Sequence, residues 1–184
     1  MATPRPGNQT VLMIVDVQVG VMRQCQNAAQ TVAHVAHTVE RARAARVPLI
    51  WVQHQNNELP RDSDAWQWVP ELLPEAGEAR VYKQFNSAFE QTGVDDLLAR
   101  LGATHIVLAG AQSNWCIRAT AYGALERGYD LTLVGDAHTT SDLDPGDGTV
   151  IDARTIVRDL NVTMKWLEYP GRRNRVAAAD EVAF

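Results

Sequence analysis

The sequence predicts a three-layer αβα sandwich, in which a doubly wound, mostly parallel sheet of about six strands lies between two layers of helices. Two observations carry this prediction. Short, nearly continuous apolar runs, such as VLMIVDV at 11–17, have the length and β-branched composition of strands buried on both faces. Longer segments with apolar residues at helical spacing alternate with these runs along the chain. Such alternation is typical of parallel strands joined by crossover helices.

The first elements are a strand at 11–17, which has Asp16 at its carboxyl end, and a helix at 27–46. Within this helix, valines recur at helical spacing and arginines occupy the last turn, where positive charge is favourable. Asn27 is the expected N-cap. Pro48 ends the helix before a second buried strand at 49–53.

A long polar stretch at 55–77 follows and contains three prolines together with Trp66 and Trp68. Loops of this length in a compact domain usually have a function, such as a lid or an interface element. A surface excursion pinned by two core tryptophans fits equally well, so both interpretations stay open. The remaining predicted elements are a strand at 80–83, a helix at 94–101, a strand at 104–109, a helix at 113–127, a strand at 130–135, a helix at about 149–167, and a tail at 175–184 that adds a strand or packs on a neighbour.

Composition limits the class of protein. Of the 184 residues, 46% are hydrophobic and 21% are charged, as expected for one globular domain spanning 1–184. The net charge of −5 and the lack of a long Lys/Arg run argue against a nucleic-acid partner. Residues 1–10 lack the apolar region of a signal peptide, and no apolar run approaches the length of a membrane span. We therefore expect a cytoplasmic protein with no membrane partner, in which Cys25 and Cys116 are free thiols.

Cys116 is the strongest single candidate for chemistry. It follows the strand at 104–109 and a short loop, which places it in the first turn of the next predicted helix. The partial positive charge of a helix N-terminus lowers the pKa of a thiol, and the free N–H groups there can hold an oxyanion. Position alone fits a buried structural cysteine equally well.

Lys83 and Asp16 complement this thiol. Lys83 ends an apolar strand beside the expected cleft, where a buried ammonium needs a partner. Asp16 ends the first strand, so its carboxylate can pair with Lys83 and accept the thiol proton. Each residue alone has an ordinary explanation: a salt bridge at the rim of the sheet for Lys83, and a loop-anchoring carboxylate for Asp16. Together with Cys116 they supply the base, cation and nucleophile that amide hydrolysis through an acyl-enzyme requires.

Three ordered motifs over about 11–184 resemble those of the isochorismatase-like hydrolases. The tripeptide DVQ at 16–18 is similar to the family's D-x-Q, and KQFNSAF at 83–89 is similar to K-x-x-x-S-A-F. The segment GAQSNWCIRATA at 110–121 is similar to G-x-x-T-x-x-C-V-x-x-T-A, with Ser113 in place of the usual threonine. The resemblance implies the αβα fold and a small-molecule substrate. Family members often assemble, so we also expect a homo-oligomer, a dimer or a tetramer.

The resemblance also implies the roles of the site residues. Cys116 would be the nucleophile, Asp16 the base and Lys83 the charge stabiliser of a Cys-Asp-Lys triad. A non-proline cis peptide is expected between Ala111 and Gln112, which would aim the N–H of Gln112, with that of Cys116, at the oxyanion.

Departures from the family motifs bear on cofactors and substrate. Nicotinamidases carry an Asp-x-His motif and a further histidine after the second strand, whereas 53–57 here contains only His54. A metal needs three or more ligands, so no metal and no other cofactor is expected. Members that cleave the vinyl ether of isochorismate need no cysteine, so Cys116 favours cleavage of a C–N bond in an amide, a lactam or a carbamoyl group. The tail at 170–184 resembles that of the streptothricin hydrolase branch, which opens a lactam.

The substrate-binding candidates are polar or aromatic residues in or near these motifs. Trp115 adjoins the nucleophile and is expected to line the pocket, whereas core packing is the alternative for the phenylalanines and a structural hydrogen bond for His54. Acidic residues of the long loop could attract a cationic substrate, and Cys25 is expected to be a bystander. A vinyl-ether hydrolase and a non-catalytic scaffold remain the alternative functions. The candidates are Gln18, His54, Phe85, Phe89 and Trp115, with Glu58, Asp62 and Asp64 in the loop.

Overall fold

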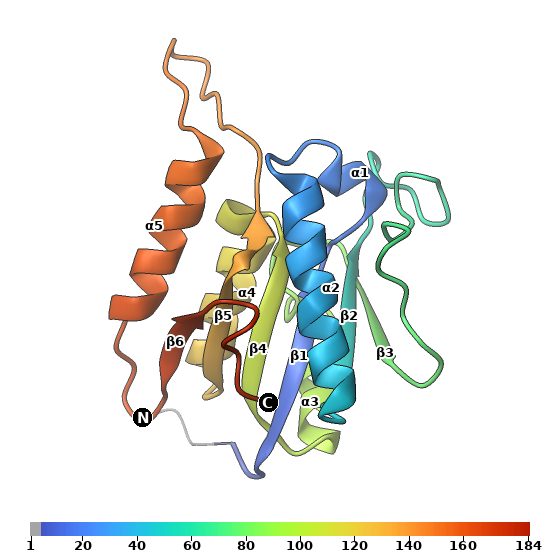
Figure 1. The fold of residues 1–184 in the computed structure, drawn as a ribbon, viewed down its shortest axis with the longest axis vertical. Helices are drawn as coiled ribbons and strands as arrows, with labels where there is room; N and C mark the ends of the chain where they lie inside the picture. Colours follow the sequence, from blue (N-terminus) through green and yellow to red (C-terminus); the bar gives the residue numbers. More distant parts are fainter. Residues whose placement is uncertain (1–4) are drawn as a thin grey trace.

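The computed structural model describes residues 5–184 and has the predicted αβα architecture (Figure 1). Its sheet contains six strands, all paired in parallel, in the order β3-β2-β1-β4-β5-β6. The chain therefore builds outward from β1 to β3, returns to the centre at β4, and builds outward again to β6. This reversal places a topological switch point between β1 and β4, where ligands of such sheets bind. The strands are β1 (Gln9–Val15), β2 (Leu49–His54), β3 (Ala79–Lys83), β4 (Ala103–Ala111), β5 (Asp130–Thr139) and β6 (Asn174–Ala177).

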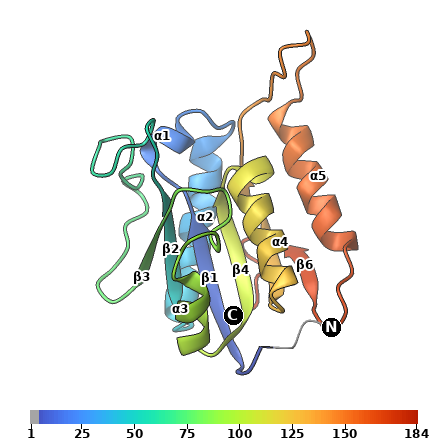
Figure 2. The same cartoon turned by 180° about the vertical axis from the view of Figure 1, so that it is seen from behind.

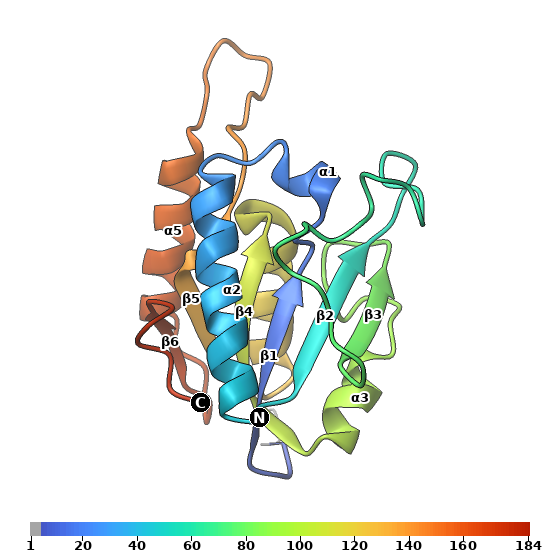
Figure 3. The same ribbon diagram turned by 45° about the vertical axis from the view of Figure 1, so that its right-hand side comes forward.

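Helices cover both faces of the sheet (Figures 2 and 3). One face packs against α2 and the C-terminal tail, and the other packs against α3, α4 and α5. Alternate residues of β1 explain this arrangement, because Met13 points into one buried cluster and Leu12 and Ile14 into the other. No helix within residues 5–184 is long and apolar enough to span a bilayer. The helices are α1 (Val19–Met22), α2 (Ala28–Ala44), α3 (Val94–Arg100), α4 (Arg118–Glu126) and α5 (Ala153–Trp166), with a π-helical turn, η1 (Ser113–Ile117), before α4.

Three local predictions are wrong. Asn27 precedes α2 but adopts a left-handed conformation, with φ of 52°, and its side chain caps nothing. The predicted helix at 113–127 is divided, because a π-helical turn precedes α4. The last helix begins at Ala153 rather than near 149, since Asp152 is its N-cap and accepts a hydrogen bond from the N–H of Thr155 at 3.0 Å.

Candidate active site

Four polar side chains meet at the carboxyl edge of the sheet. Asp16 follows β1, His54 and Lys83 are the last residues of β2 and β3, and Cys116 lies in the turn after β4. The strand register explains the meeting, because His54 is paired with Lys83 across β2 and β3. Parallel strands end at the same edge, so residues far apart in sequence converge there. Figure 3 shows α1 and the loop after β2 above this edge.

Lys83 is at the centre of the group. Its Nζ lies 2.6 Å from Oδ2 of Asp16, 3.1 Å from Sγ of Cys116 and 3.2 Å from Nδ1 of His54. The Lys83 and Asp16 side chains are almost completely buried, and Cys116 keeps 9% of its surface exposed. A buried ion pair persists only when both charges have good partners, and here each charge has the other. The structure thus brings together the three residues that the sequence singled out.

Backbone geometry positions the carboxylate and the thiol. Asp16 has φ of 53°, a left-handed conformation that aspartate tolerates better than most residues. Its N–H donates to the carbonyl of Val52 at 2.9 Å, which fixes the end of β1 against β2. Gly110 has φ of 128°, and a Cβ at this position would collide with the carbonyl oxygen of Val15. The Ala111–Gln112 peptide bond that follows is cis, at the position implied by the resemblance.

Burial reverses the expected acidity of the thiol. A helix N-terminus was expected to lower the pKa of Cys116, but burial and the charge of Asp16 raise it to about 12, against the opposing effect of Lys83. The thiol is therefore protonated at neutral pH. Burial by itself would lower the pKa of Lys83, but its attraction to Asp16 and Cys116 outweighs burial and holds the pKa above the ordinary value. The resting site thus contains a neutral thiol beside an ammonium–carboxylate pair.

His54 contributes a neutral ring. Burial and the charge of Lys83 lower its pKa, so the imidazole is uncharged at neutral pH. Nδ1 faces the ammonium, a donor, and must accept its hydrogen bond, which assigns the ring proton to Nε2. Asp16, His54 and Cys116 also offer three potential metal ligands within 4.8 Å of one another. The ammonium of Lys83 already contacts all three residues, and its charge would repel a cation bound there. The expectation of a metal-free site stays a prediction.

A cavity of about 440 Å³ opens onto the thiol, so the group is accessible from outside. Trp115 lies at this cavity with 46% of its surface exposed, and His54 and Gln112 also line it. Two charged residues of opposite sign, Arg23 and Glu58, complete a polar wall. The remaining lining residues are Asp16, Gly20, Val21, Gln24, Leu59, Ala65, Asn86 and Cys116.

The structure places three of the substrate-binding candidates outside the cavity above the thiol. Gln18 is fully buried and ties the end of β2 to the loop, because its amide exchanges hydrogen bonds with the backbone of His54 and donates to the carbonyl of Trp66. Phe89 is 5% exposed and stacks on Tyr129 in the core. Phe85 is exposed but lines a neighbouring hollow rather than the cavity above the thiol. Gln18 and Phe89 thus make structural contacts, and Phe85 faces the neighbouring hollow.

The loop after β2 is pinned by its two tryptophans and contributes residues to the cavity wall. Trp66 and Trp68 are buried, and Trp68 packs edge-on against Trp51 with ring centroids 5.1 Å apart. The same loop supplies Glu58 and two apolar residues to the cavity wall, whereas Asp62 and Asp64 do not line it. The tryptophans therefore anchor the loop as a fixed wall of the site.

Two sets of contacts were not anticipated from the sequence. Arg23 and Gln24 reach the cavity from the end of α1, a four-residue helix without a periodic pattern. Behind the site, the buried ring of His138 hydrogen-bonds Ser113 Oγ at 2.8 Å and Asn161 Oδ1 at 3.1 Å, which fixes the turn that carries the thiol. By contrast, Asn86 lies within the motif at 83–89 and could have been suspected.

A thiol, a carboxylate and an ammonium grouped at the carboxyl edge of an αβα sandwich define the class of candidate cysteine hydrolases. The sequence of residues 10–157 matches the family model described as the Isochorismatase domain, so the chain belongs to the isochorismatase family.

Individual relatives agree with this assignment. A streptothricin hydrolase from Streptomyces noursei is 32% identical over 142 residues, covering 72% of this chain and 50% of the relative. A maleamate amidohydrolase from Pseudomonas putida is 37% identical over 85 residues, covering 44% of this chain and 38% of the relative. The chain thus spans half or less of the length of these two relatives. The crystal structure of an isochorismatase from Pseudomonas putida is 28% identical with a TM-score of 0.83, covering 95% of this chain and 92% of that chain.

The raised pKa of Cys116 predicts how the thiol reacts with iodoacetamide. Because only the thiolate is alkylated, the rate for Cys116 should rise about tenfold per pH unit between about pH 7 and pH 10. Asp16→Asn removes a charge that raises this pKa, so the variant should be alkylated at least about tenfold faster at about pH 8. A Cys25→Ser background removes the competing thiol. Alkylation of Cys116 that is independent of pH above neutrality, or unchanged by Asp16→Asn, would contradict the assignment.

Proposed function

We propose that this protein is a cysteine hydrolase that cleaves a C–N bond of a small molecule through an acyl-enzyme. The observation that supports the proposal is the contact of Lys83 Nζ with both Asp16 and Cys116 at the floor of an open cavity. Nucleophile, base and cation are the groups that acyl transfer requires. Two free cysteines fit a reducing compartment, so we further propose that the enzyme is cytoplasmic.

In the proposed reaction, Asp16 takes the proton of the Cys116 thiol as sulfur attacks the carbonyl carbon of the substrate. A C–S bond forms and the carbonyl oxygen becomes an oxyanion, which accepts hydrogen bonds from the backbone N–H groups of Gln112 and Cys116. The proton passes from Asp16 to the leaving nitrogen, the C–N bond breaks, and an acyl-thioester remains. Water, deprotonated by Asp16, then hydrolyses the thioester and restores the thiol. Proton transfer in the attacking step allows a thiol with a raised pKa to react without a standing thiolate.

Lys83 keeps this carboxylate ionised and near the sulfur. Its ammonium also offsets the negative charge that develops on the thiol as the proton leaves. Neutral His54 adds no second positive charge, so Lys83 remains the source of positive charge beside the sulfur. These roles explain why the two charges and the thiol are buried together rather than spread over the rim.

The cavity and the relatives support a proposal for the substrate class. A volume of about 440 Å³ suits a small molecule, and Arg23 and Glu58 give the wall one charge of each sign. Trp115 offers a flat apolar surface at the same wall. Because relatives include a streptothricin hydrolase and a maleamate amidohydrolase, we propose an amide, lactam or carbamoyl substrate, with a streptothricin-type lactam as the specific candidate.

A substrate panel with covalent trapping tests this proposal. The panel holds nicotinamide, N-carbamoyl amines, cyclic lactams including streptothricin, and isochorismate. Intact-mass measurement after rapid acid quench should show the protein plus the acyl part of a C–N substrate, and peptide mapping should place the added mass on Cys116. Cys25 in the same molecule is the internal control and should stay unmodified.

Three results would contradict the proposal in different ways. Turnover of isochorismate alone, without a covalent adduct, would indicate a vinyl-ether hydrolase. Turnover of an amide with the adduct on another residue would reject the nucleophile. Absence of both turnover and adduct across the panel would favour a non-catalytic scaffold.

A further inference from the structure

The segment between β5 and α5 forms an arm that leaves the body of the protein. Residues 141–152, here called the arm, extend beyond the N-terminus of α5 (Figure 1). The arm is ordered as a narrow hairpin, because Leu143 and Ile151 exchange two backbone hydrogen bonds of 2.9 Å. Asp144 and Asp147 each accept a backbone N–H in the turns at its tip. Gln26 ties the base of the arm to the body with a hydrogen bond of 2.6 Å to Asp142, whereas the tip extends away from the body (Figure 1). A hairpin tip with defined turns in this position is suited to contact another molecule.

The composition of the arm indicates what it would contact. Its sequence, SDLDPGDGTVID, contains four aspartates and no lysine or arginine. Within residues 5–184, none of these aspartates forms an ion pair with a basic residue. Val150 and Ile151 are 61% and 43% exposed on the same hairpin. The tip of the arm therefore presents the carboxylates of Asp144 and Asp147, which have no ion-pair partner within residues 5–184, and exposed apolar surface lies on the same hairpin. This combination fits a basic surface with apolar neighbours.

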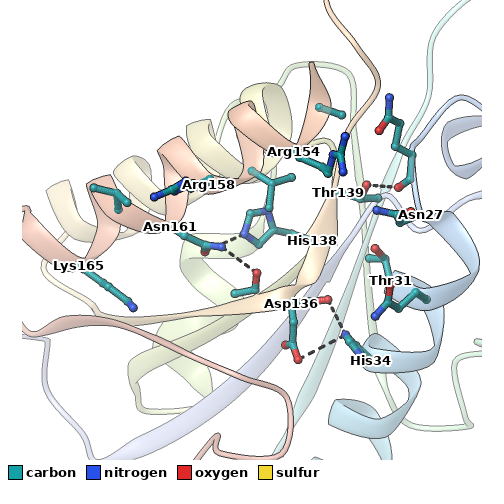
Figure 4. Close-up of a pocket in the computed structure, with 16 residues that line it drawn as sticks. Asn27, Thr31, His34, Asp136, His138, Thr139, Arg154, Arg158, Asn161 and Lys165 are labelled. Carbon is teal, nitrogen blue, oxygen red and sulfur yellow. Dashed lines mark hydrogen bonds and ion pairs between the residues drawn. The ribbon is translucent and has the colours of Figure 1, made fainter. Parts of the chain in front are cut away.

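Such a surface lies along α5. A cavity of about 470 Å³ separates α5 from α2 beside β5, and Arg154, Arg158 and Lys165 line it (Figure 4). None of these three cations forms an ion pair within residues 5–184, although Arg154 is near enough to Asp152 to help lower the pKa of that carboxyl. Asp136 is the acidic residue of the cavity, and its Oδ2 lies 3.4 Å from Nδ1 of His34. With three basic residues against this one carboxylate, the cavity carries a net positive charge.

Apolar side chains flank this cavity as well. Val162, which lines it, is 44% exposed, and Trp166 at the end of the same helix is 81% exposed. Large exposed aromatic residues beside unpaired cations are typical of protein interfaces. The arm of the same molecule cannot cover them, because it points away from α5 while Lys165 and Trp166 lie at the far end of that helix (Figure 1).

We propose that the acidic arm of a second copy of this chain docks in the basic cavity between α2 and α5, and that the two copies exchange arms about a two-fold axis. Arm and cavity are both present on every copy, so a two-fold arrangement satisfies both contacts at once and closes the assembly. The aspartates at the tip of one arm would face the cations of the other copy's cavity. Val150 and Ile151 would cover apolar side chains exposed on α5 of that copy.

A small anion is the competing occupant of the cavity, and the structure favours it less. The buried ring of His138, which lines the cavity, already has both nitrogens hydrogen-bonded, one to Ser113 and the other to Asn161. The cations that remain are on exposed side chains of one helix, which suit a rim of ion pairs better than a closed anion pocket. A small anion would also leave the exposed apolar residues of the arm and of α5 without a partner.

Charge reversal with rescue tests the proposal by light scattering coupled to size exclusion. The wild type is expected to be a dimer or a multiple of it, and Asp144→Lys/Asp147→Lys or Arg154→Glu/Arg158→Glu should each raise the dissociation constant about 100-fold or more. Combining the four substitutions reverses both partners and should restore the assembly. Glu90→Lys/Asp96→Lys, the same charge change at exposed positions away from the arm and the cavity, should keep the wild-type mass.

Two further measurements separate the proposal from loss of folding and from anion binding. Asp144→Asn/Asp147→Asn keeps the acceptors of the turns while removing the charge, so it should also weaken association. Acrylamide should quench Trp166 more strongly in the charge-reversed variants than in the wild type, with Trp166→Phe as the blank. The proposal would be overturned if the wild type is a monomer or if neither charge reversal weakens the assembly. It would also be overturned if the variant with all four substitutions does not reassemble. Phosphate binding in the cavity would also overturn it if the arm variants keep the same mass as the wild type.

Discussion

Cys116→Ala is expected to lower kcat on the C–N substrate by about 10⁵-fold or more, because a covalent route cannot start without its nucleophile. Asp16 and Lys83 would remain in contact, and the side chain at position 116 would be smaller by one sulfur atom. The variant should therefore still bind substrate, and its free energy of unfolding should change by about 1 kcal/mol or less. The measurements are steady-state turnover, substrate affinity by calorimetry and thermal unfolding.

Cys25→Ala is the matched control for this prediction. Cys25 is the other free thiol, and burial raises its pKa to about 11, against a hydrogen bond from Gln112. It is not among the residues that line the cavity above Cys116, so its removal should leave most of the turnover. Wild-type turnover by Cys116→Ala would reject the nucleophile, and equal losses in both variants would indicate a structural effect of thiol removal.

The meeting of the three central residues was predictable because it depends on few physical rules. Apolar runs of strand length identify buried parallel strands, and parallel strands in such a sheet end at a common edge. Asp16 and Lys83 mark two of these ends, and Cys116 follows a third, so their convergence needs no knowledge of side-chain packing. The motifs added the residue types expected there and the Ala111–Gln112 cis peptide, which spacing alone does not indicate.

Where the structure departs from these predictions, the cause is packing that the sequence does not display. Phe89 and Phe85 belong to one motif, yet only tertiary contacts decide that the first enters the core and the second faces a different hollow. Gln18 was expected to contact substrate, but its amide satisfies backbone groups that the loop would otherwise bury without partners. The prediction of a lowered pKa for Cys116 is wrong for a similar reason. The argument from the helix N-terminus ignores burial and a neighbouring carboxylate, which both raise this pKa.

Lys83→Met is expected to cost about 3–5 kcal/mol of unfolding free energy, because it leaves the buried Asp16 carboxylate without its counter-charge. The methionine side chain keeps most of the aliphatic volume, so packing is nearly preserved. For a chain of this size, the loss corresponds to a fall of about 6–20 °C in Tm. Thermal unfolding of the variant and of the wild type at neutral pH measures it.

The double variant Asp16→Asn/Lys83→Met separates this effect from a packing defect. Asparagine is neutral and tolerates the left-handed backbone at position 16, so the double variant contains no uncompensated buried charge. It should recover most of the lost stability while remaining inactive. If the double variant is as unstable as Lys83→Met alone, the loss comes from packing and the ion pair is not its cause.

The pH dependence of stability provides an independent test of the same pair. Because Asp16 and Cys116 hold the pKa of Lys83 above 10.5, its charge contributes fully to stability below that value. The contribution is lost as the pH rises through the raised pKa of the folded state, where the ammonium loses its proton. The wild type should therefore keep this stability from about pH 7 to about pH 10 and lose it above, whereas the double variant should lack this alkaline loss. If both proteins lose the same stability at alkaline pH, the loss comes from other groups. The buried pair of Asp16 and Lys83 then makes no measurable contribution to the free energy of unfolding.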